Sequence, residues 1–292
     1  MFKLGTTTLA LAGWLADPSQ PEQSQHQRLD AMRRVVQDYG LPVVELSLDL
    51  PMVHPTVFDV GFYEGVAELQ RELGFACTAH LPFLWIEPSS LNETIRQASV
   101  ESLHRAVELT RSVVIETYVL HLWGLATALI TAQLQAGPER QAIMGALGVQ
   151  AERSLADLCE ILEPRDICIE NLEDSHLELT LALANRHQTS LCFDVGHLAW
   201  RGDDPLEFLR RHGDRIREVH LHDAARQQAG TTPAVRDHLA LGDGQIDYRA
   251  VLDTLEEMRF GGAVILEVNS EADLQKSLER LRQTRATTGA RR

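Results

Sequence analysis

Ile167-Cys168-Ile169-Glu170-Asn171 is a short apolar run that ends in an acidic and an amide side chain. Other apolar runs along the chain end in a similar polar residue, at His80, His121, Asp194, His220 and Glu267. A short apolar run bounded by polar or turn residues is typical of a fully buried strand. The recurrence therefore predicts a series of buried strands, each of which ends in a polar side chain.

Eight runs of this kind alternate with amphipathic segments along the whole chain. The predicted strands are Phe2–Thr7, Val43–Leu48, Ala76–His80, Tyr118–Leu122, Ile167–Glu170, Ser190–Asp194, Glu218–His222 and Ala263–Val268. Strands that alternate with helices indicate βαβ units and a parallel sheet.

The segments between the strands carry helix start and stop signals. The helices predicted over Gln27–Tyr39 and Phe62–Leu73 are each followed by a glycine, which suits a left-handed C-cap. Ser90 and Glu93 resemble a capping box, Asp204-Pro205 combines a cap with a first-turn proline, and Asp247 precedes another helix.

The alternation is not interrupted by a linker, and the glycine fingerprint of dinucleotide-binding sheets is absent. A closed barrel therefore fits better than an open, doubly wound sheet. We predict a single-domain (β/α)8 TIM barrel over residues 1–285 and a disordered tail over residues 286–292.

The composition of the chain limits the classes of partner that it is expected to bind. The chain has 292 residues, 44% of them hydrophobic, and 27 bases against 42 acids give a net charge of −15. This charge disfavours nonspecific attraction to nucleic acid and to anionic membranes, and no apolar run is long enough for a membrane span. The four cysteines form no C-x-x-C pair, so we expect reduced thiols in a cytoplasmic protein. Leu4–Ala16 resembles a weak signal peptide, but its removal would delete the first predicted strand.

Strand parity predicts where the polar residues point. Side chains alternate between faces, so the strand-end acids Glu170, Asp194 and Glu267 share a face with Cys168, Cys192 and Ile265. The residues between them, Ile169, Phe193 and Leu266, should then point outward under the helices. The acids are therefore expected to converge on the barrel axis, at the carboxyl-terminal mouth.

Taken singly, a strand-end histidine is commonly a hydrogen-bonded structural residue, and a strand-end acid commonly caps the next helix. Taken together, Glu170, Asp194 and Glu267 would repel one another in a confined mouth, and a divalent cation is the usual compensation. Ligands that mix carboxylate and imidazole suit manganese, zinc or cobalt better than magnesium.

The order of these motifs is similar to that of the xylose-isomerase-like superfamily, which includes sugar isomerases, epimerases and the endonuclease IV type of abasic-site nuclease (AP endonuclease family 2). The matching stretches are Ala79–Pro82, Leu120–Leu122, Ile169–Asn171, Phe193–His197, Val219–Asp223, Asp237–Gly244, Ile246-Asp247 and Leu266–Asn269.

In the epimerase branch, the resemblance implies one metal held by Glu170, Asp194, His220 and Glu267. The metal would chelate a carbonyl and a neighbouring hydroxyl, while Glu170 and Glu267 remove and return a proton. His197 would orient a hydroxyl, and Arg226 would stabilise the enediolate oxygen unless it is an ordinary solvated loop arginine.

In the nuclease branch, His80 and His121 resemble ligands of a further metal shared through Glu170, so the resemblance allows one to three ions. A third metal would need His197, His238 and an aspartate two residues before His238. Arg236 occupies that position and Asp237 adjoins it, which puts the third metal in doubt. A corrinoid-remodelling branch matches Gly5-Thr6-Thr7 and Tyr118–Leu122 loosely.

Because a one-metal epimerase does not need His80 and His121, two interpretations of them stay open. They either hydrogen-bond to substrate or to the ligand carboxylates, or they hold a second metal for hydrolysis. Trp85, Trp123, Glu45 and Asp49 could line the pocket, or could be ordinary packing and solvated residues.

We therefore expect a metal-dependent isomerase or epimerase of a polyhydroxylated small molecule. The alternatives are a di- or trimetal phosphoester hydrolase and a non-catalytic, metal-stabilised binding module. The apolar segment Val113–Ile130 is compatible with a homo-oligomer. The loops Leu81–Ser90 and Ala224–Arg236, where this fold places specificity, do not identify the substrate.

Overall fold

The computed structural model describes residues 2–12, 17, 19–172, 176–226 and 235–289. Eight parallel strands close into a barrel in the spatial order β1-β10-β7-β6-β5-β4-β3-β2. They are β1 (Lys3–Thr7), β2 (Val43–Ser47), β3 (Ala76–His80), β4 (Ile115–Leu120), β5 (Ile167–Glu170), β6 (Ser190–Asp194), β7 (Ile216–Leu221) and β10 (Ala263–Leu266). Every predicted strand overlaps one of these, and the predicted single-domain TIM barrel is confirmed.

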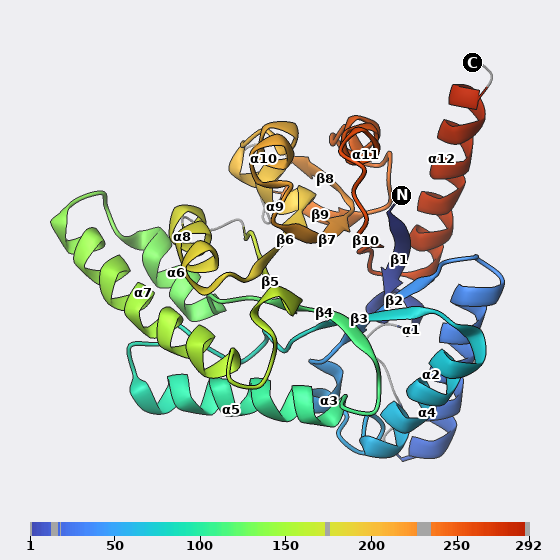
Figure 1. The fold of residues 1–292 in the computed structure, drawn as a ribbon, viewed down its shortest axis with the longest axis horizontal. Coiled ribbons are helices and arrows are strands. Elements are labelled where there is room, and N and C mark those ends of the chain that lie inside the picture. The colour runs from blue at the N-terminus through green and yellow to red at the C-terminus, as the bar shows by residue number, and fades with distance from the viewer. Residues whose placement is uncertain (1, 13–16, 18, 173–175, 227–234, 290–292) are drawn as a thin grey trace.

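Helices surround the barrel, with α5 and α7 packed side by side on one flank and α2 and α4 on another (Figure 1). Their bounds are α1 (Leu9–Ala12), α2 (Pro21–Gln37), α3 (Leu50–Val53), α4 (Val60–Leu73), α5 (Glu93–Leu109), α6 (Leu125–Gln133), α7 (Pro138–Leu158), α8 (Leu177–His187), α9 (Val195–Arg201), α10 (Pro205–His212), α11 (Tyr248–Glu257) and α12 (Glu271–Gly289), with a short 3-10 turn at Pro164–Asp166. None of the described helices is both long and apolar enough to cross a membrane.

Helix α12 continues through Gly289, beyond the predicted domain end at residue 285, and residues 290–292 lie outside the described part of the chain. The caps at Asp204 and Asp247 are present, since each side chain accepts a backbone N–H of the following helix. The predicted box at Ser90 is wrong: Asn92 caps α5 by accepting from Thr94 N, because the helix begins later.

The predicted parity of the strands is confirmed. Cys168 and Cys192 pack with Val119 in a small buried cluster, and Ile265 packs with Val43 in another. Ile169, Phe193 and Leu266 belong instead to the large apolar cluster that includes helix residues. The two small clusters fill the barrel interior, and the large cluster is the layer between the barrel and its helices.

Strand β1 pairs with β10 on one side and with β2 on the other. Most of this strand lies in the segment Leu4–Ala16, which resembles a weak signal peptide in sequence but contributes a barrel strand in the structure.

An antiparallel hairpin stands at the carboxyl-terminal side of β7. It consists of β8 (Asp223–Arg226) and β9 (Val235–Leu239), where the sequence predicted only a loop, and residues 227–234 between them lie outside the described residues. Buried Asp223 braces the hairpin, because its carboxylate accepts the backbone N–H groups of Ala224, Gly242 and Ile246. The brace returns the chain toward the barrel mouth.

Candidate metal centre

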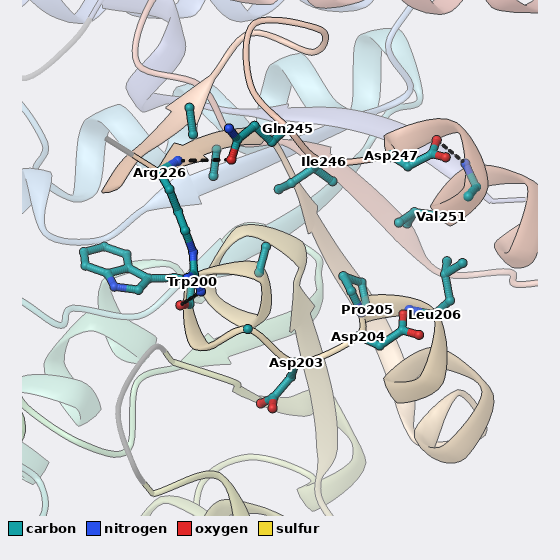
Figure 2. A pocket seen from close by; sticks show the side chains of 15 residues that line it. Trp200, Asp203, Asp204, Pro205, Leu206, Arg226, Gln245, Ile246, Asp247 and Val251 are labelled. Carbon is teal, nitrogen blue, oxygen red and sulfur yellow. Dashed lines mark hydrogen bonds between the residues drawn. The ribbon is translucent and has the colours of Figure 1, made fainter. Parts of the chain in front are cut away.

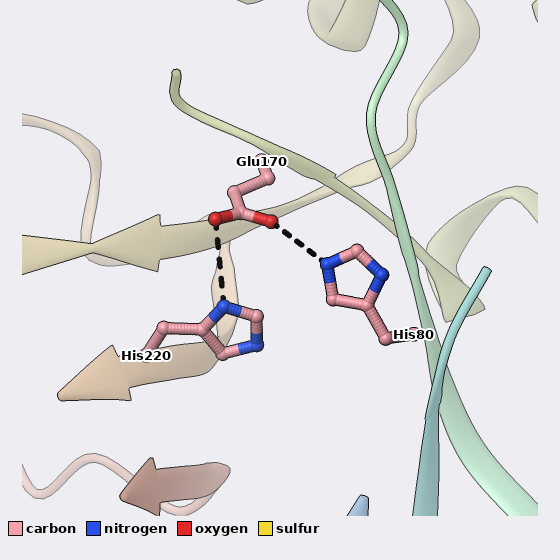
Figure 3. Close-up of side chains that lie close together, drawn as sticks. All are labelled: His80, Glu170 and His220. Atoms are coloured by element: carbon pink, nitrogen blue, oxygen red, sulfur yellow. Dashed lines mark ion pairs between the residues drawn. The ribbon is translucent and has the colours of Figure 1, made fainter. Parts of the chain in front are cut away.

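The side chains at the ends of β3, β5 and β7 meet over the barrel axis. Figure 3 shows His80 and His220 directed at opposite oxygens of the Glu170 carboxylate. His80 Nε2 lies 3.3 Å from Glu170 Oε2, and His220 Nδ1 lies 3.4 Å from Glu170 Oε1. His220 is fully buried and Glu170 is 1% exposed, so this contact is shielded from solvent.

The four residues that the resemblance implies for one metal come together. Glu170, Asp194, His220 and Glu267 each offer a ligand atom, and these atoms all lie within 4.8 Å of one another. Asp194 is also fixed by its neighbours: its backbone pairs with the Asn171 side chain, and one carboxylate oxygen accepts His197 N at 2.6 Å. The strand-end acid thus serves as helix cap and as candidate ligand at once.

Two atoms of this set face each other without a hydrogen bond. His220 Nδ1 and Glu267 Oε2 are 3.1 Å apart, and both are buried atoms that lack a hydrogen-bond partner among the described residues. A buried, unpaired nitrogen and carboxylate oxygen are costly unless something satisfies them. A divalent cation would satisfy both, so the residues present fit a metal.

Further histidines surround Glu170. His121 Nε2 lies 2.8 Å from Glu170 Oε2, and His197 Nδ1 lies 3.3 Å from Glu170 Oε1. Burial alone would raise the pKa of the Glu170 carboxyl, but the charges of His121 and His220 outweigh it and hold that pKa well below its usual range. Glu170 is therefore ionised, as a metal ligand must be.

A second group of ligand atoms lies beside the first. His222, His238 and Glu267 have ligand atoms within 4.8 Å of one another. His238 N donates to His222 Nδ1 at 3.0 Å, and the two rings stack at 4.4 Å. His222 Nε2 then faces Asp194 Oδ2 at 3.1 Å. The hairpin places His238 here through a backbone φ of 51°.

This group differs from the third-metal set that the nuclease resemblance implies. That set contains His197, whereas the group of mutually close ligand atoms that includes His238 also contains His222 and Glu267. Asp237 Oδ1 lies 3.2 Å from His238 Nδ1, and Arg236 is exposed. The motif Val219–Asp223 contains His222, but the sequence alone predicted no role for this residue. Its position two residues beyond His220 could have indicated that both side chains lie on the same face of the strand. Gly196 gives it room, since a Cβ there would lie 2.0 Å from His222 Cε1.

A pocket of about 290 Å³ opens above the centre, lined by His80, His121, Glu170, His197, Asp237, His238 and Glu267 together with apolar residues. Trp85 stands at its rim, 76% exposed, with a φ of 59° that is unusual for a bulky residue. Trp123 lines the pocket as a buried residue whose indole N–H donates to Thr180 Oγ1 at 2.7 Å. The pocket thus combines a polar floor with an aromatic wall.

The structure places Arg226 apart from these residues. Its guanidinium lies in a separate cavity of about 360 Å³, shown in Figure 2, where Nη2 donates to Trp200 O at 3.1 Å. Arg226 does not line the pocket above the metal ligands. Asp49, also considered for the pocket, is buried and accepts the backbone N–H groups of Phe83 and Leu84.

From the sequence, Glu45 could either line the pocket or be a solvated residue, and Glu218 was not identified as a candidate. Both are fully buried inside the barrel, and Glu45 Oε2 lies 3.0 Å from His220 Nε2. Parity offered a signal, since Glu45 shares a face with Val43, and Glu218 with His220.

The chain matches a model of a known protein family. A model described as xylose isomerase-like TIM barrel matches residues 33–284. Inosose dehydratase of Lacticaseibacillus casei is 29% identical over 109 residues, which cover 33% of this chain and 36% of the relative. The match thus spans about a third of that relative's length. An uncharacterised protein of Methanocaldococcus jannaschii is 26% identical over 240 residues, covering 74% of this chain and 72% of that one.

Solved structures share the fold. A D-tagatose 3-epimerase-like protein superposes with a TM-score of 0.72 at 20% identity, covering 99% of both chains. The E. coli 3-keto-D-glucoside 4-epimerase gives 0.68 at 17%, covering 98% of this chain and 100% of that one. An AP endonuclease family 2 protein of Brucella melitensis gives 0.61 at 14%, covering 92% and 94%. At such identities the likeness concerns the fold alone, and epimerase and nuclease neighbours both share it.

Proposed function

We propose that this chain, which belongs to the xylose isomerase-like TIM barrel family, is a divalent-metal-dependent isomerase or epimerase of a polyhydroxylated small molecule. The observation that carries the proposal is the convergence of Glu170, Asp194, His220 and Glu267 within ligand distance, with Glu170 and Glu267 lining a pocket and Asp194 and His220 buried. A sugar or cyclitol ketone is the substrate class that such a site would suit.

The four residues would hold one ion, and manganese, zinc or cobalt suits their mixed nitrogen and oxygen donors better than magnesium. When bound, such a cation polarises a substrate carbonyl and so acidifies the neighbouring C–H bond. It would also satisfy the facing atoms His220 Nδ1 and Glu267 Oε2.

The two glutamates differ in their surroundings, which suggests separate roles. Glu267 Oε2 is approached by His220 and His238 but has no hydrogen-bond partner among the described residues, whereas Glu170 Oε2 forms a hydrogen bond with His121 Nε2. Glu267 is therefore the better candidate to remove the proton, and Glu170 to return it from the opposite side of the substrate. His197 lines the pocket and would orient a substrate hydroxyl. Arg226 has no role here, because its side chain lies in the other cavity.

The test combines metal analysis with a panel of ketoses and inososes in deuterated water. One equivalent of metal with exchange of the C–H beside the carbonyl, and formation of the epimer or the aldose, supports the proposal. Loss of water from an inosose would instead assign a dehydratase, the activity for which relatives covering about a third of the chain are named. Absence of both exchange and turnover across the panel, with metal bound, would refute the proposed reaction.

A metal-dependent hydrolase is the second candidate, because His80 and His121 both reach Glu170 Oε2. The His222–His238–Glu267 group offers a further set of ligands. Two or three equivalents of metal per chain, with release of phosphate from phosphoesters, would favour this candidate. Tight metal binding without turnover on either panel would favour a binding module.

A cytoplasmic location belongs to the same proposal, in line with Cys77, Cys168 and Cys192 as buried free thiols. A homo-oligomer belongs to it as well. Exposed Leu125 and Leu129 on α6 are part of the apolar segment that prompted this expectation, and a molar mass from light scattering tests it.

A further inference from the structure

The His220 side chain contacts an acidic residue on a strand that does not pair with the strand of His220. Glu45 lies on β2 and His220 on β7, and these strands are separated by β1 and β10 in the barrel. Glu45 Oε2 nevertheless lies 3.0 Å from His220 Nε2, across the barrel interior. Both residues are fully buried, so water does not compete for this contact.

The contact determines which nitrogen of His220 faces the metal ligands. A carboxylate offers only acceptor oxygens, so His220 Nε2 must carry the hydrogen that is donated to Glu45. When His220 loses its second proton, the hydrogen stays on Nε2, and the hydrogen-free Nδ1 is then directed at Glu267 Oε2, 3.1 Å away, and at Glu170 Oε1, 3.4 Å away. This is the tautomer in which an imidazole can bind a cation through Nδ1.

We propose that Glu45 is a positioning residue for the metal centre, which fixes the tautomer and the ring orientation of His220 and makes Nδ1 a stronger ligand. A metal-binding histidine commonly donates its second N–H to a carboxylate, and loss of that partner typically weakens metal binding 10- to 100-fold. The inference rests on the metal site of the proposed function, but not on the reaction assigned to it.

A second acid in the same interior provides a matched control. Glu218 lies two residues before His220 on β7 and is also fully buried. It accepts the hydroxyl of Thr117 at 2.5 Å, and none of the hydrogen bonds described joins it to His220. Glu218 thus shares the depth of Glu45 and the same buried group of ligand atoms, but not the hydrogen bond to the imidazole, and burial beside Glu45 raises the pKa of its carboxyl to about 8.

The experiment compares Glu45→Gln with Glu218→Gln in the full chain, without substrate. The dissociation constant of Zn²⁺ is measured by competition with a chromophoric chelator, and the visible spectrum of the Co²⁺-loaded protein reports its ligand field. Melting of the metal-free proteins monitors folding. We expect Glu45→Gln to raise the dissociation constant 10- to 100-fold and to shift the Co²⁺ bands, and Glu218→Gln to stay within about threefold of the wild type.

Equal effects of the two substitutions would overturn the proposal, because they would mean that any buried carboxyl in the barrel interior supports the metal, whether or not it contacts His220. An unchanged dissociation constant in Glu45→Gln, or a wild-type chain that binds no divalent metal, would also overturn it. If Glu45→Gln does not fold, Glu45→Asp replaces it and should weaken binding about 10-fold, because the carboxylate is withdrawn by one methylene. Wild-type protein that binds metal but lacks isomerase activity would refute the proposed reaction and leave this inference standing.

Discussion

Glu170 is the residue on which the contacts of the centre converge. His121 and His80 approach its Oε2, and His197 and His220 approach its Oε1. In the metal-free chain all four imidazoles face this one buried carboxylate, so replacing it changes the electrostatics around each of them.

The substitution Glu170→Gln removes the negative charge of this side chain and keeps its size and shape. We expect kcat/KM to fall at least 100-fold, because a candidate ligand and proton carrier is lost together, and bound metal to fall below one equivalent. Steady-state kinetics and elemental analysis on the same preparation check this. Activity near that of the wild type would contradict the site assignment.

His238 distinguishes the two enzymatic candidates. It lies 3.6 Å from Glu267 Oε2 and belongs to the second ligand group rather than to the first. His238→Ala should lower isomerase activity less than 10-fold if one metal suffices, and hydrolase activity at least 100-fold if the second group holds an ion. The two assays run side by side on one variant decide which holds.

Arg226 supplies a prediction of small effect. Since its guanidinium donates to Trp200 O in a separate cavity, Arg226→Ala should change kcat/KM less than about threefold. His197→Ala, which alters the pocket itself, is the comparison. A loss with Arg226→Ala as large as that with His197→Ala would mean that the arginine reaches the substrate.

At the scale of elements, the barrel strands carry ligands at their ends, and the β8–β9 hairpin brings in His238 from outside the barrel. The strands could be predicted because short apolar runs that end in a polar residue recur along the chain. The hairpin could not, because Asp223-Ala-Ala-Arg has no strand pattern and the Asp223 carboxylate that braces it accepts backbone N–H groups from Ala224, Gly242 and Ile246.

Asp223→Ala tests that brace. It would leave three backbone N–H groups without their acceptor, and we expect the free energy of unfolding to fall by about 3 kcal/mol. Urea unfolding measures it. Asp247→Ala, which removes only the cap of α11, is the control and should cost about 1 kcal/mol. A smaller loss for Asp223 than for Asp247 would show that the hairpin does not need the brace.

At the scale of the molecule, a divalent ion should stabilise the fold, since it binds ligands that come together only in the native barrel. Metal at 100 times its dissociation constant contributes about 2.7 kcal/mol, so for a chain of this length chelation should lower the melting temperature by roughly 4–5 °C. Scanning calorimetry with and without chelator tests this. The melting temperature of Glu170→Gln should respond less, and a wild-type chain indifferent to chelator would argue against a resident metal.

Metal affinity should also rise with pH. In the metal-free chain, burial lowers the pKa of His80, but its hydrogen bond to Glu170 and the charges of Glu45 and Glu170 outweigh burial and raise that pKa to about 9. Burial is likewise outweighed at His238, where Glu267 and Asp237 raise the pKa to about 10. The pKa of the proposed ligand His220 is likewise raised well above its ordinary value by neighbouring groups that outweigh burial, so His220 must lose a proton on binding, as must His80 and His238 if they hold a further ion. Binding should therefore tighten from pH 7 to pH 9 with release of protons. Calorimetry in buffers of different ionisation enthalpy measures the release; affinity independent of pH would exclude these histidines as ligands.

The amino-acid order alone was enough for the barrel, its interior and exterior faces, and the convergence of the strand-end acids Glu170, Asp194 and Glu267, while the family resemblance implied that His220 joins them as a ligand. Those features follow from local rules: strands alternate their side chains, and the carboxyl ends of parallel strands meet at one mouth. Three features could be seen only in the folded chain. They are the contact of Glu45 with His220, the stacking of His222 on His238, and the position of Arg226 in a cavity away from the metal ligands. They depend on contacts across the barrel and on the path of a hairpin, which no local pattern specifies, because the residues that meet are distant in sequence and share no period.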